Sequence, residues 1–409
     1  MGEDNHGSFG CPFQAEEFTM ALSRRSFMKA VGVGAVSGMT GSFINARGLE
    51  AWRWGAEEPA PPDSSEILLS SNENPLGPGK TVVGAIDEAL GSNGLTAARY
   101  PGDYFDDPIA EAIAARFGVQ PENVLVGCGS TQVLVTATHV YTSKDRPLVG
   151  SLPTYEECAG YASVIGTPVK SVPLDSRYRM DLEHMLYAAK GAGMLFYCNP
   201  NNPVATVVPA GDTKDFLPRM LRRSPETRIL VDEAYIDYVT ASSHESMIQM
   251  ALEDPRVIVA RTFSKAYGMA GLRVGYAIAH RDTIKELAAW HMGNSISALS
   301  LAGAIAAIGQ DPSFIEKERK RNQLVREFTT DFFARSGRPV TDSQTNFLFV
   351  DVRMPIEEFR EACKKRGVRV GRPFPPLWTH ARVSLGTMEE MKRATRVFGE
   401  VFSQAARAA

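Results

Sequence analysis

One lysine in the sequence is placed for covalent chemistry. Lys265 lies in RTFSKAYGMAGLRVGY, residues 261–276, among small, hydroxylated and glycine residues, and Arg273 follows it eight positions later. A lysine that is removed from water near another cation has a lowered pKa, and its neutral amine attacks carbonyl carbon. The hydroxyls of Thr262 and Ser264 and the guanidinium of Arg273 are groups that bind phosphate. The stretch therefore predicts a nucleophilic amine beside a phosphate site.

Further polar side chains follow other predicted strands. GCGSTQVL opens a predicted helix with Gly129, Ser130 and Thr131, whose N–H groups and hydroxyls would face a phosphate at the helix N-terminus. An ordinary N-cap turn is the alternative interpretation of these residues. The other segments are SLPTYEE, CNPNNPVAT and RILVDEAY, which contribute Tyr155, Asn202, Asp232 and Tyr235. An aspartate at the end of a strand is also a common helix N-cap, so Asp232 has two interpretations.

Taken together, these side chains match one cofactor. An aldehyde with a phosphate and a ring nitrogen would use the lysine for an imine and the aspartate for the protonated ring nitrogen. It would use asparagine and tyrosine for the ring hydroxyl, and serine, threonine and arginine for the phosphate. That cofactor is pyridoxal 5′-phosphate (PLP). No protein-bound metal and no disulfide framework is expected, because the seven histidines show no HExxH spacing and the five cysteines are scattered without a CxxC pair, at Cys11, Cys128, Cys158, Cys198 and Cys363.

The elements that would position these residues form an α/β pattern. Short β-branched runs alternate with helix-length segments, at 123–126, 147–150, 194–197, 228–235, 257–262 and 273–279. This alternation predicts a mainly parallel sheet sandwiched by helices. In an open parallel sheet the ligand lies beyond the carboxyl ends of the strands, so the polar residues should gather at one edge.

The alternation of short strands and helix-length segments ends at about Asp311. A charged amphipathic helix at about 313–336 leads to TNFLFVDV, a helix near 356–366, strands around 368 and 382 and a terminal helix from about 388. This order predicts a smaller α+β domain. The predicted divisions are a signal segment (1–48), a proline-rich linker (49–65), an N-terminal arm with part of the small domain (66–105), the large PLP-binding domain (106–310) and the C-terminal small domain (311–409).

The composition limits the number of domains and the kinds of partner that we expect. With 409 residues, 44% hydrophobic and 22% charged, the chain is long enough for two domains that each have a core. The net charge is −3, and the basic cluster at 317–321 is interleaved with glutamates, so no nucleic-acid partner is expected.

The N-terminus resembles an export signal. Residues 23–29 read SRRSFMK, and residues 30–44 run without a charge but are too few to span a bilayer. Paired arginines before a short apolar run resemble a twin-arginine (Tat) signal, which predicts the Tat export machinery as a partner and a periplasmic location. A disordered basic arm, or a helix with an accidental arginine pair, is the alternative, and Met20 is a second candidate start.

The motifs, in order, resemble the histidinol-phosphate-type aminotransferases of the fold type I PLP family. They are NENPLGP (72–78), RYPG (99–102), PTY, NPNNP, DEAY, FSKAYGMAGLRVGY, TNF (345–347) and RVSLGT (382–387), and the match covers about residues 66–405. The resemblance implies a PLP-dependent transaminase that exchanges an amino group between an amino acid or related amine and a 2-oxo acid.

The resemblance also implies a role for each matching residue. Lys265 would form the Schiff base and move the substrate proton, Asp232 would hold the ring nitrogen protonated, and Tyr155 would stack on the ring. Tyr235 and Asn202 would bond the ring oxygen. The phosphate contacts would come from the start of the 129–131 helix and from the lysine segment, through Gly129, Ser130, Thr131, Thr262, Ser264 and Arg273.

Residues near the start and the end of the matching region, 66–405, would complete the site. Tyr100 corresponds to a residue that the family contributes from the neighbouring subunit, which implies a homodimer. Arg382 corresponds to the arginine that holds the substrate's carboxylate or an equivalent anionic group, and Arg372 lies where a second substrate-facing arginine is common, although a surface role is equally open. Asn74 and Asn346, within the matching motifs, are further candidate substrate-binding residues.

Several departures from the family pattern leave the substrate open. Val204 and Ala205 replace the usual Thr-Gly after NPNNP, and no PYxPG-like segment precedes residue 66. Histidinol phosphate is a cytoplasmic intermediate, so an exported enzyme is not expected in histidine synthesis. The insert PFPPLWTHA either selects an uncommon amino donor through Trp378 or Phe374, or is a packed loop.

Two other functions are consistent with the same motifs. A PLP-dependent lyase, decarboxylase or cyclase would use the same cofactor and scaffold to break a different bond. A non-enzymatic exported binding protein is disfavoured because Lys265 and Asp232 are both present.

Overall fold

The structure is a computed structural model that describes residues 66–408. The predicted signal segment and linker, residues 1–48 and 49–65, lie outside the described residues. Among the described helices none is by itself long and apolar enough to span a membrane, and the pair Ala298–Ile308 and Ser313–Arg335, bent by 87°, qualifies only by length and composition.

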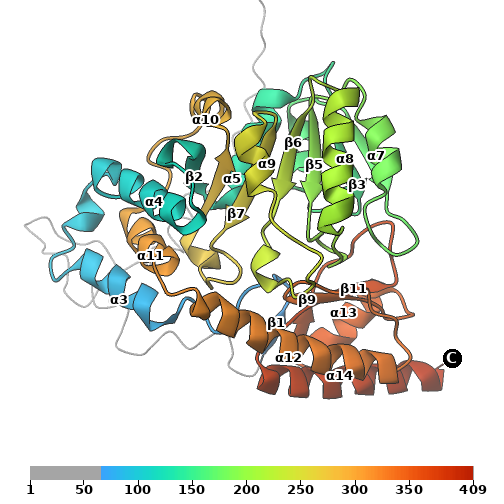
Figure 1. Ribbon diagram of the computed structural model, residues 1–409. Helices are drawn as coiled ribbons and strands as arrows, with labels where there is room; N and C mark the ends of the chain where they lie inside the picture. Colours follow the sequence, from blue (N-terminus) through green and yellow to red (C-terminus); the bar gives the residue numbers. More distant parts are fainter. Residues whose placement is uncertain (1–65, 409) are drawn as a thin grey trace, which may run out of the picture. The chain divides into compact units, whose positions relative to one another are not determined.

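A seven-stranded sheet forms the centre of the larger part of the molecule (Figure 1). Its order is β2-β8-β7-β6-β5-β3-β4, and only β8 runs antiparallel to its neighbours. The prediction of a mainly parallel sheet is therefore confirmed. The strands are β2 (Val124–Cys128), β3 (Leu148–Leu152), β4 (Val169–Pro173), β5 (Met194–Cys198), β6 (Arg228–Asp232), β7 (Val257–Thr262) and β8 (Val274–Ala279).

Helices cover both faces of this sheet, and each face has its own core. Leu195 and Val231 belong to one hydrophobic cluster, whereas Phe196 and Leu230, one residue away on the same strands, belong to the other. Because successive side chains in a strand point to opposite faces, β5 and β6 are buried on both. The covering helices are α4 (Gly102–Phe117), α5 (Gly129–Tyr141), α6 (Glu157–Val164), α7 (Leu182–Ala188), α8 (Ala210–Arg223), α9 (Ile248–Glu253), α10 (Arg281–Ala288) and α11 (Ala298–Ile308).

Two element boundaries differ from the sequence prediction for local reasons. The predicted strand 228–235 ends at Asp232, because the Asp232 Oδ1 accepts a hydrogen bond from the Ala234 N–H and turns the chain. The predicted helix 356–366 ends at Lys364, and Gly367 follows it with φ +77°, a conformation that glycine adopts without strain. Strand β4 was not predicted, since VKSVP is an edge strand with mostly exposed side chains.

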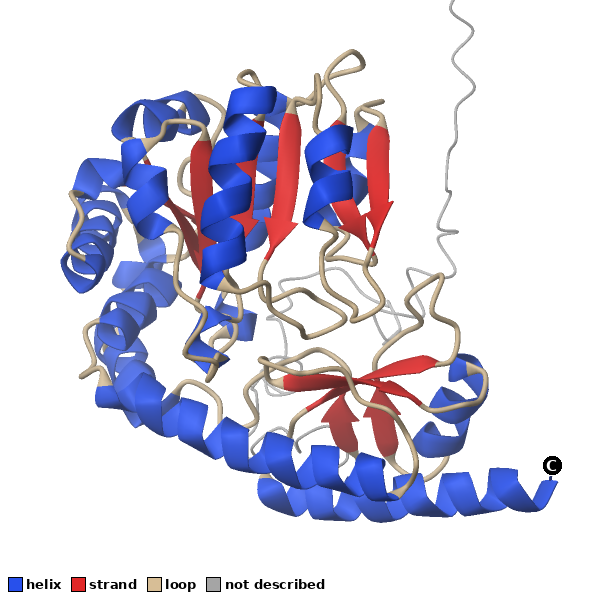
Figure 2. Ribbon diagram, turned by 45° about the vertical axis from the view of Figure 1, so that its right-hand side comes forward, coloured by secondary structure: helices blue, strands red, loops and turns tan. Residues whose placement is uncertain are grey.

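The C-terminal part has a separate core, in which Phe333, Phe359 and Phe398 pack together. Long helices α12 and α14 lie alongside one another below two small sheets (Figure 2). Strands β9 and β11 pair antiparallel, and β10 pairs in parallel with β1, near the start of the described chain. The elements are β1 (Ile67–Leu69), α12 (Ser313–Arg335), β9 (Phe347–Asp351), α13 (Ile356–Lys364), β10 (Val368–Val370), β11 (His380–Ser384) and α14 (Met388–Ala408).

The first described residues join both parts. Strand β1 belongs to a C-terminal sheet, whereas the next helix, α3 (Gly79–Leu90), packs on α11 of the larger part. Between them, residues 70–78 cross from one part to the other. Short 3₁₀ turns complete the fold, at Thr96–Ala98, Pro121–Asn123, Ile236–Tyr238 and Ala270–Leu272.

Candidate active site

A cavity of about 620 Å³ lies where the carboxyl ends of β6 and β7 meet the C-terminal part and residues 70–73. The fold thus gathers polar residues from strand ends that are far apart in the sequence, as the parallel-sheet rule requires. The sequence-predicted residues that line it are Ser130, Thr131, Tyr155, Asn202, Asp232, Tyr235, Thr262, Ser264, Lys265, Arg273, Arg372 and Arg382.

Lys265 follows strand β7 and extends into this cavity. Its Nζ donates a hydrogen bond to the Ser71 carbonyl at 3.3 Å and lies 5.5 Å from the centre of the Tyr235 ring. Removal from water lowers its pKa to about 8, and the neighbouring Arg382 and Arg273 act in the same direction. A substantial fraction of this amine is therefore neutral near pH 8, the form that reacts with a carbonyl.

Asp232 ends strand β6 as a deeply buried carboxylate. Its Oδ1 accepts from the Ala234 N–H at 3.1 Å, and Cys198 Sγ lies 3.9 Å from Oδ2. Burial raises its pKa to about 6 even though the charge of Lys265 acts to lower it, and no ion pair joins Asp232 to a basic side chain among the described residues. A buried carboxylate of this kind is stabilised by a cation, and the protonated nitrogen of a pyridine ring supplies one.

The start of helix α5 and Arg273 form a phosphate-sized cradle. Gly129 has φ +72°, and a Cβ added to it would overlap the guanidinium of Arg273. The Arg273 Nη1 donates to the Ala270 carbonyl at 2.9 Å and to Ser264 Oγ at 3.4 Å. Because a glycine stands at the helix start, the guanidinium can lie against the first N–H groups of the helix, where an anion binds. Gly129 itself does not line the cavity.

The opposite end of the cavity is a chain of hydrogen bonds between neutral groups. The Asn72 Nδ2 donates to the Tyr235 hydroxyl at 3.1 Å, and Ser384 Oγ donates to the Asn72 Oδ1 at 2.8 Å. Burial raises the pKa of Tyr235, so the phenol remains protonated at neutral pH. Its hydroxyl is therefore available as a donor to a ring oxygen.

Arg382 is a buried guanidinium without an acidic partner among the described residues. Its Nη1 donates to the Asn202 Oδ1 at 2.8 Å and its Nη2 to the Ser70 carbonyl at 2.6 Å, whereas Nε is buried with no partner. The side chain is 9% exposed, and burial lowers its pKa. Because a buried charge needs a counter-ion, an anionic ligand at this position is expected on physical grounds alone.

Arg372 lies at the exposed mouth of the same cavity. It forms an ion pair with Glu156, donates to the Pro373 carbonyl at 3.0 Å and stacks 4.2 Å from the centre of the Phe374 ring. Arg382 lies over the same ring at 4.9 Å. Phe374 is thus a packed support for two arginines, and Trp378 is 57% exposed and does not line the cavity.

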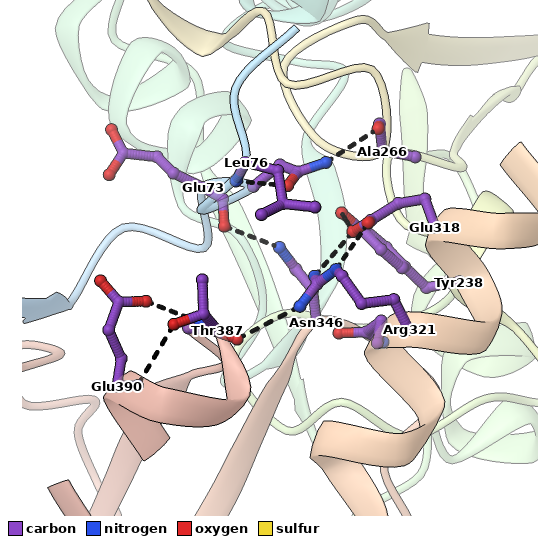
Figure 3. A network of polar contacts seen from close by, with 12 residues as sticks. Glu73, Leu76, Tyr238, Ala266, Glu318, Arg321, Asn346, Thr387 and Glu390 are labelled. Atoms are coloured by element: carbon purple, nitrogen blue, oxygen red, sulfur yellow. Dashed lines mark hydrogen bonds and ion pairs between the residues drawn. The ribbon is translucent and has the colours of Figure 1, made fainter. Parts of the chain in front are cut away.

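Asn74 and Asn346 do not line the cavity, contrary to the expectation that they contact substrate. The Asn74 Nδ2 donates to the Ala266 carbonyl at 3.1 Å, and the Asn346 Nδ2 donates to the carbonyls of Asn72 at 2.9 Å and Glu73 at 3.4 Å. Figure 3 shows the Asn346 amide turned toward the backbone of Glu73, whose carboxylate points away from it. These two residues hold the 72–76 segment beside Lys265, and they act on the site through that segment.

Several cavity residues were not found from the sequence. Ser70, Ser71, Asn72 and Glu73 line the cavity, although within NENPLGP only Asn74 was selected. The other additions are Ala234, just after β6, Ala270 and Gly271 of the 3₁₀ turn before Arg273, and Arg360 and Val370 of the C-terminal part. Asn72 and Glu73 could have been selected as site residues, because they belong to the matching motif NENPLGP. No sequence motif marks Arg360 as a site residue.

Tyr100 is not brought to this cavity within one chain. Its side chain is 83% exposed, and it lines a separate hollow with residues 97–101 and 294–299. Its assignment to the site of a neighbouring subunit therefore remains a prediction.

A lysine and a buried aspartate at strand ends of the large sheet, a glycine-started helix beside Arg273, and a buried arginine facing them from β11 are the features of a PLP-dependent enzyme of fold type I. The chain belongs to the aminotransferase class I and II family, whose model matches residues 64–398. Members of this family use PLP, and PLP is therefore the cofactor of this chain, as predicted.

Two relatives and one solved structure illustrate the similarity. The chain is 33% identical over 343 residues to a histidinol-phosphate aminotransferase of Moorella thermoacetica, covering 82% of this chain and 86% of that protein. A second protein of that name, from Halalkalibacterium halodurans, is 31% identical over 343 residues, covering 83% and 89%. The crystal structure of histidinol-phosphate aminotransferase from Sinorhizobium meliloti in complex with pyridoxal-5′-phosphate has a TM-score of 0.76 and 27% identity, covering 83% of this chain and 91% of that one.

Proposed function

We propose that the chain moves an amino group between an amino acid and a 2-oxo acid, with Lys265 as the group that transfers the substrate proton. One observation carries the proposal. Lys265, whose pKa is lowered, and Arg382, which is buried and has no acidic partner among the described residues, line the same cavity. When bound, PLP supplies an electron sink that stabilises negative charge at the amino acid Cα.

The residues of the chain divide the remaining work. Arg382 binds the substrate carboxylate, a bidentate pairing for which a guanidinium is suited. With the carboxylate fixed, the neutral Nζ of Lys265 takes the proton from Cα. Asp232 keeps the ring nitrogen protonated, since a carboxylate and a pyridinium stabilise each other.

The ring and phosphate contacts fix the orientation in which this proton moves. Asn202 and Tyr235 would donate to the ring oxygen, and Tyr155 would pack on the ring, since all three line the cavity. Binding of the phosphate falls to the helix start and the lysine segment, through Ser130, Thr131, Thr262, Ser264 and Arg273. Contacts of this kind hold the reacting carbon at a fixed position relative to the Lys265 amine, which lowers the barrier to proton transfer.

The first experiment adds amino acids one at a time to the PLP-loaded protein without any 2-oxo acid. A transaminase half-reaction releases the matching 2-oxo acid in an amount equal to the number of sites, and then stops. Continued formation of an amine, a cyclic product or free ammonia would instead assign the chain to the decarboxylase, cyclase or lyase alternative.

We also propose that the active form is a homodimer in which Tyr100 completes the partner's site. Support comes from the exposure of Tyr100 and from its place in a hollow that is separate from the cavity of its own chain. Co-expressed Tyr100→Ala and Lys265→Ala chains test this. A heterodimer with Tyr100 acting across subunits has one intact site and half the wild-type rate, whereas action within one chain leaves no intact site.

Export by the twin-arginine route is a separate proposal that rests on Arg24 and Arg25. It is tested by changing both residues to Lys and following the protein's location, which should shift to the cytoplasm. An unchanged location would remove the proposal. If the chain is exported, its amino donor differs from the histidinol phosphate for which its relatives are named, because that compound is made and used in the cytoplasm.

A further inference from the structure

The insert at 373–381 packs against the loop that carries Asn202. Val204, Phe349 and Phe374 form a small hydrophobic cluster of their own, and none of them is more than 2% exposed. Val204 lies in the loop after β5, Phe349 on β9 and Phe374 in the insert. The cluster is therefore a contact between the larger part and the C-terminal part, and none of its three residues lines the cavity.

Hydrogen bonds hold the same loop to the C-terminal part. Thr341 Oγ1 donates to the Val204 carbonyl at 2.6 Å, and the Gln344 N–H donates to the Ala205 carbonyl at 2.9 Å. Both donors lie in the segment before β9. The Val204 side chain thus enters the cluster from a backbone that is already fixed, and Asn202, two residues earlier, is fixed with it.

Arg382 lies between the cluster and this loop. Its guanidinium carbon is 4.9 Å from the centre of the Phe374 ring, and its Nη1 donates to the Asn202 Oδ1 at 2.8 Å. The Phe347 ring is farther away, at 5.8 Å. A guanidinium is attracted to an aromatic face and stacks on it, so the contact restricts the plane in which the group can lie.

The orientation of this guanidinium matters for a carboxylate ligand. Two parallel N–H···O bonds form only when the guanidinium and the carboxylate share a plane. A side chain that turns freely must be ordered when the ligand binds, and this ordering lowers the affinity. Phe374 acts on the ligand only through Arg382, because its own ring is buried outside the cavity lining.

We propose that Phe374, supported by Val204, is a positioning residue that fixes the Arg382 guanidinium for the α-carboxylate of the substrate. The inference rests on the proposed function for the role of Arg382. Val204 and the insert are both departures from the family pattern. In this account they act together on one arginine, and the insert contributes to the binding of the α-carboxylate instead of selecting the amino donor.

The test measures equilibrium binding of two probes to the PLP-loaded, full-length protein, followed by the absorbance of PLP. The probes are 2-methylalanine and 2-methylalaninamide. Neither has an α-proton, so Lys265 cannot start transamination, and they differ only in a carboxylate against a neutral amide. The ratio of their affinities measures the contribution of the α-carboxylate, whereas a general loss of packing or of PLP lowers both affinities alike.

Wild-type protein should bind the acid about 10- to 100-fold more tightly than the amide, the range for hydrogen bonds to a charged group. Phe374→Leu should reduce this ratio about 2- to 10-fold, the cost of ordering one side chain, through weaker binding of the acid alone. Val204→Ala should reduce the ratio by a smaller factor, because the ring remains but loses part of its support. If Phe374→Leu does not fold, Val204→Ala decides the question.

Phe398→Leu is the matched control, because it makes the same change at a buried ring that packs on Phe333 and Phe359 in the separate C-terminal core. It should leave the ratio unchanged. A ratio that Phe374→Leu leaves unchanged, or that Phe398→Leu lowers equally, would make Phe374 a structural residue only and overturn the proposal.

The wild-type ratio separates this proposal from the function on which it rests. If wild-type protein binds acid and amide equally, the role of Arg382 in the proposed function fails, and the role of Phe374 fails with it. If the wild-type preference is present but survives both Phe374→Leu and Val204→Ala, only the role of Phe374 is removed.

Discussion

At the scale of single residues, burial acts in opposite directions on the two central ionisable groups. It lowers the pKa of Lys265 to about 8 and raises that of Asp232 to about 6, so both are displaced toward the neutral form. Each displacement is a cost to the protein without its cofactor, because removal from water disfavours whichever form is charged. With PLP bound, the neutral amine of Lys265 would face the cofactor's aldehyde and the carboxylate of Asp232 would pair with the protonated ring nitrogen, which would offset this cost.

The lysine is expected to be indispensable. Lys265→Ala should slow the release of 2-oxo acid by at least about 10²- to 10⁴-fold, the usual contribution of a positioned acid–base group. Rapid mixing of the PLP-loaded variant with its amino donor measures this. Lys285→Ala, an exposed lysine on helix α10, is the control and should keep the wild-type rate. A Lys265→Ala rate equal to wild type would remove the proposed mechanism.

Asp232 should destabilise the cofactor-free protein at neutral pH. Its pKa rises from 3.8 to about 6 on folding, so the folded chain holds the extra proton and loses stability as pH increases through this range. The loss amounts to about 3 kcal/mol above pH 6, at 1.36 kcal/mol per pKa unit. Cofactor-free Asp232→Asn should therefore be the more stable protein at pH 7.5 by up to that amount.

Urea unfolding of both cofactor-free proteins at pH 4 and pH 7.5 measures this difference. The advantage of the asparagine variant should shrink toward pH 4, where the wild-type carboxyl is protonated in both states. The opposite trend, with wild type gaining stability as pH rises, would show that Asp232 already has a cation partner in the cofactor-free protein.

At the scale of elements, the site depends on how closely β8 approaches the start of helix α5. A Cβ added to Gly275 would overlap the backbone of Gly129 and Ser130, which form the phosphate cradle. Glycine is thus the residue that lets a strand lie against a helix N-terminus at this point. Strand, helix and cradle form one unit.

Gly275→Ala should consequently weaken PLP binding and lower the free energy of unfolding by about 1–3 kcal/mol, the cost of overpacking a core. Cofactor titration followed by absorbance, together with urea unfolding, reports both quantities. Gly160→Ala in helix α6 is the matched control, since a Cβ there meets no atom within 4 Å and alanine favours helix. Equal effects of the two changes would show that the close approach is unimportant.

Much of this element-level arrangement could be predicted from the sequence. Buried strands such as β5 and β6 carry continuous apolar runs, and the topology brings polar residues at or after the strand ends, such as Asn202, Asp232 and Thr262, to one edge. Residues that reach the cavity by tertiary placement could not be predicted in this way. Arg360 lies on an amphipathic helix among other charged residues, and nothing in its local pattern separates it from the exposed face. Likewise, Asn74 and Asn346 share motifs with cavity residues, but their amides turn to the backbone.

At the scale of the whole described molecule, the cavity is closed by contacts between parts that have separate cores. Arg382 of β11 reaches Asn202, and Asn72 is bonded both to Tyr235 and to Ser384. Asn346 fastens the intervening backbone from the C-terminal part. The positions of Lys265 and its surroundings thus depend on both cores.

Asn346→Ala should loosen the 72–73 segment, because two backbone carbonyls lose their donor. A reduction of about 1–3 kcal/mol in the free energy of unfolding is expected for buried groups left unsatisfied. The rate of 2-oxo acid release should also fall, with PLP affinity less affected, since the phosphate cradle lies on other elements. A variant with unchanged turnover would show that the segment holds its position without Asn346.

The pairing of β1 with β10 has a consequence for the order in which the molecule is completed. Ile67 pairs with Val368, so the first strand of the described chain emerges from the ribosome long before its only partner strand in that sheet. All strands of the large sheet have been synthesised by residue 279. This sheet can therefore form before β10, the strand that pairs with β1, has been made. Residues 70–73 also lack their hydrogen-bond partners Asn346, Arg382 and Ser384 until the C-terminal part is made, so the cavity cannot be completed before then. A chain interrupted before residue 368 would leave Ile67 and Leu69, both buried in the complete molecule, without the strand that pairs with them.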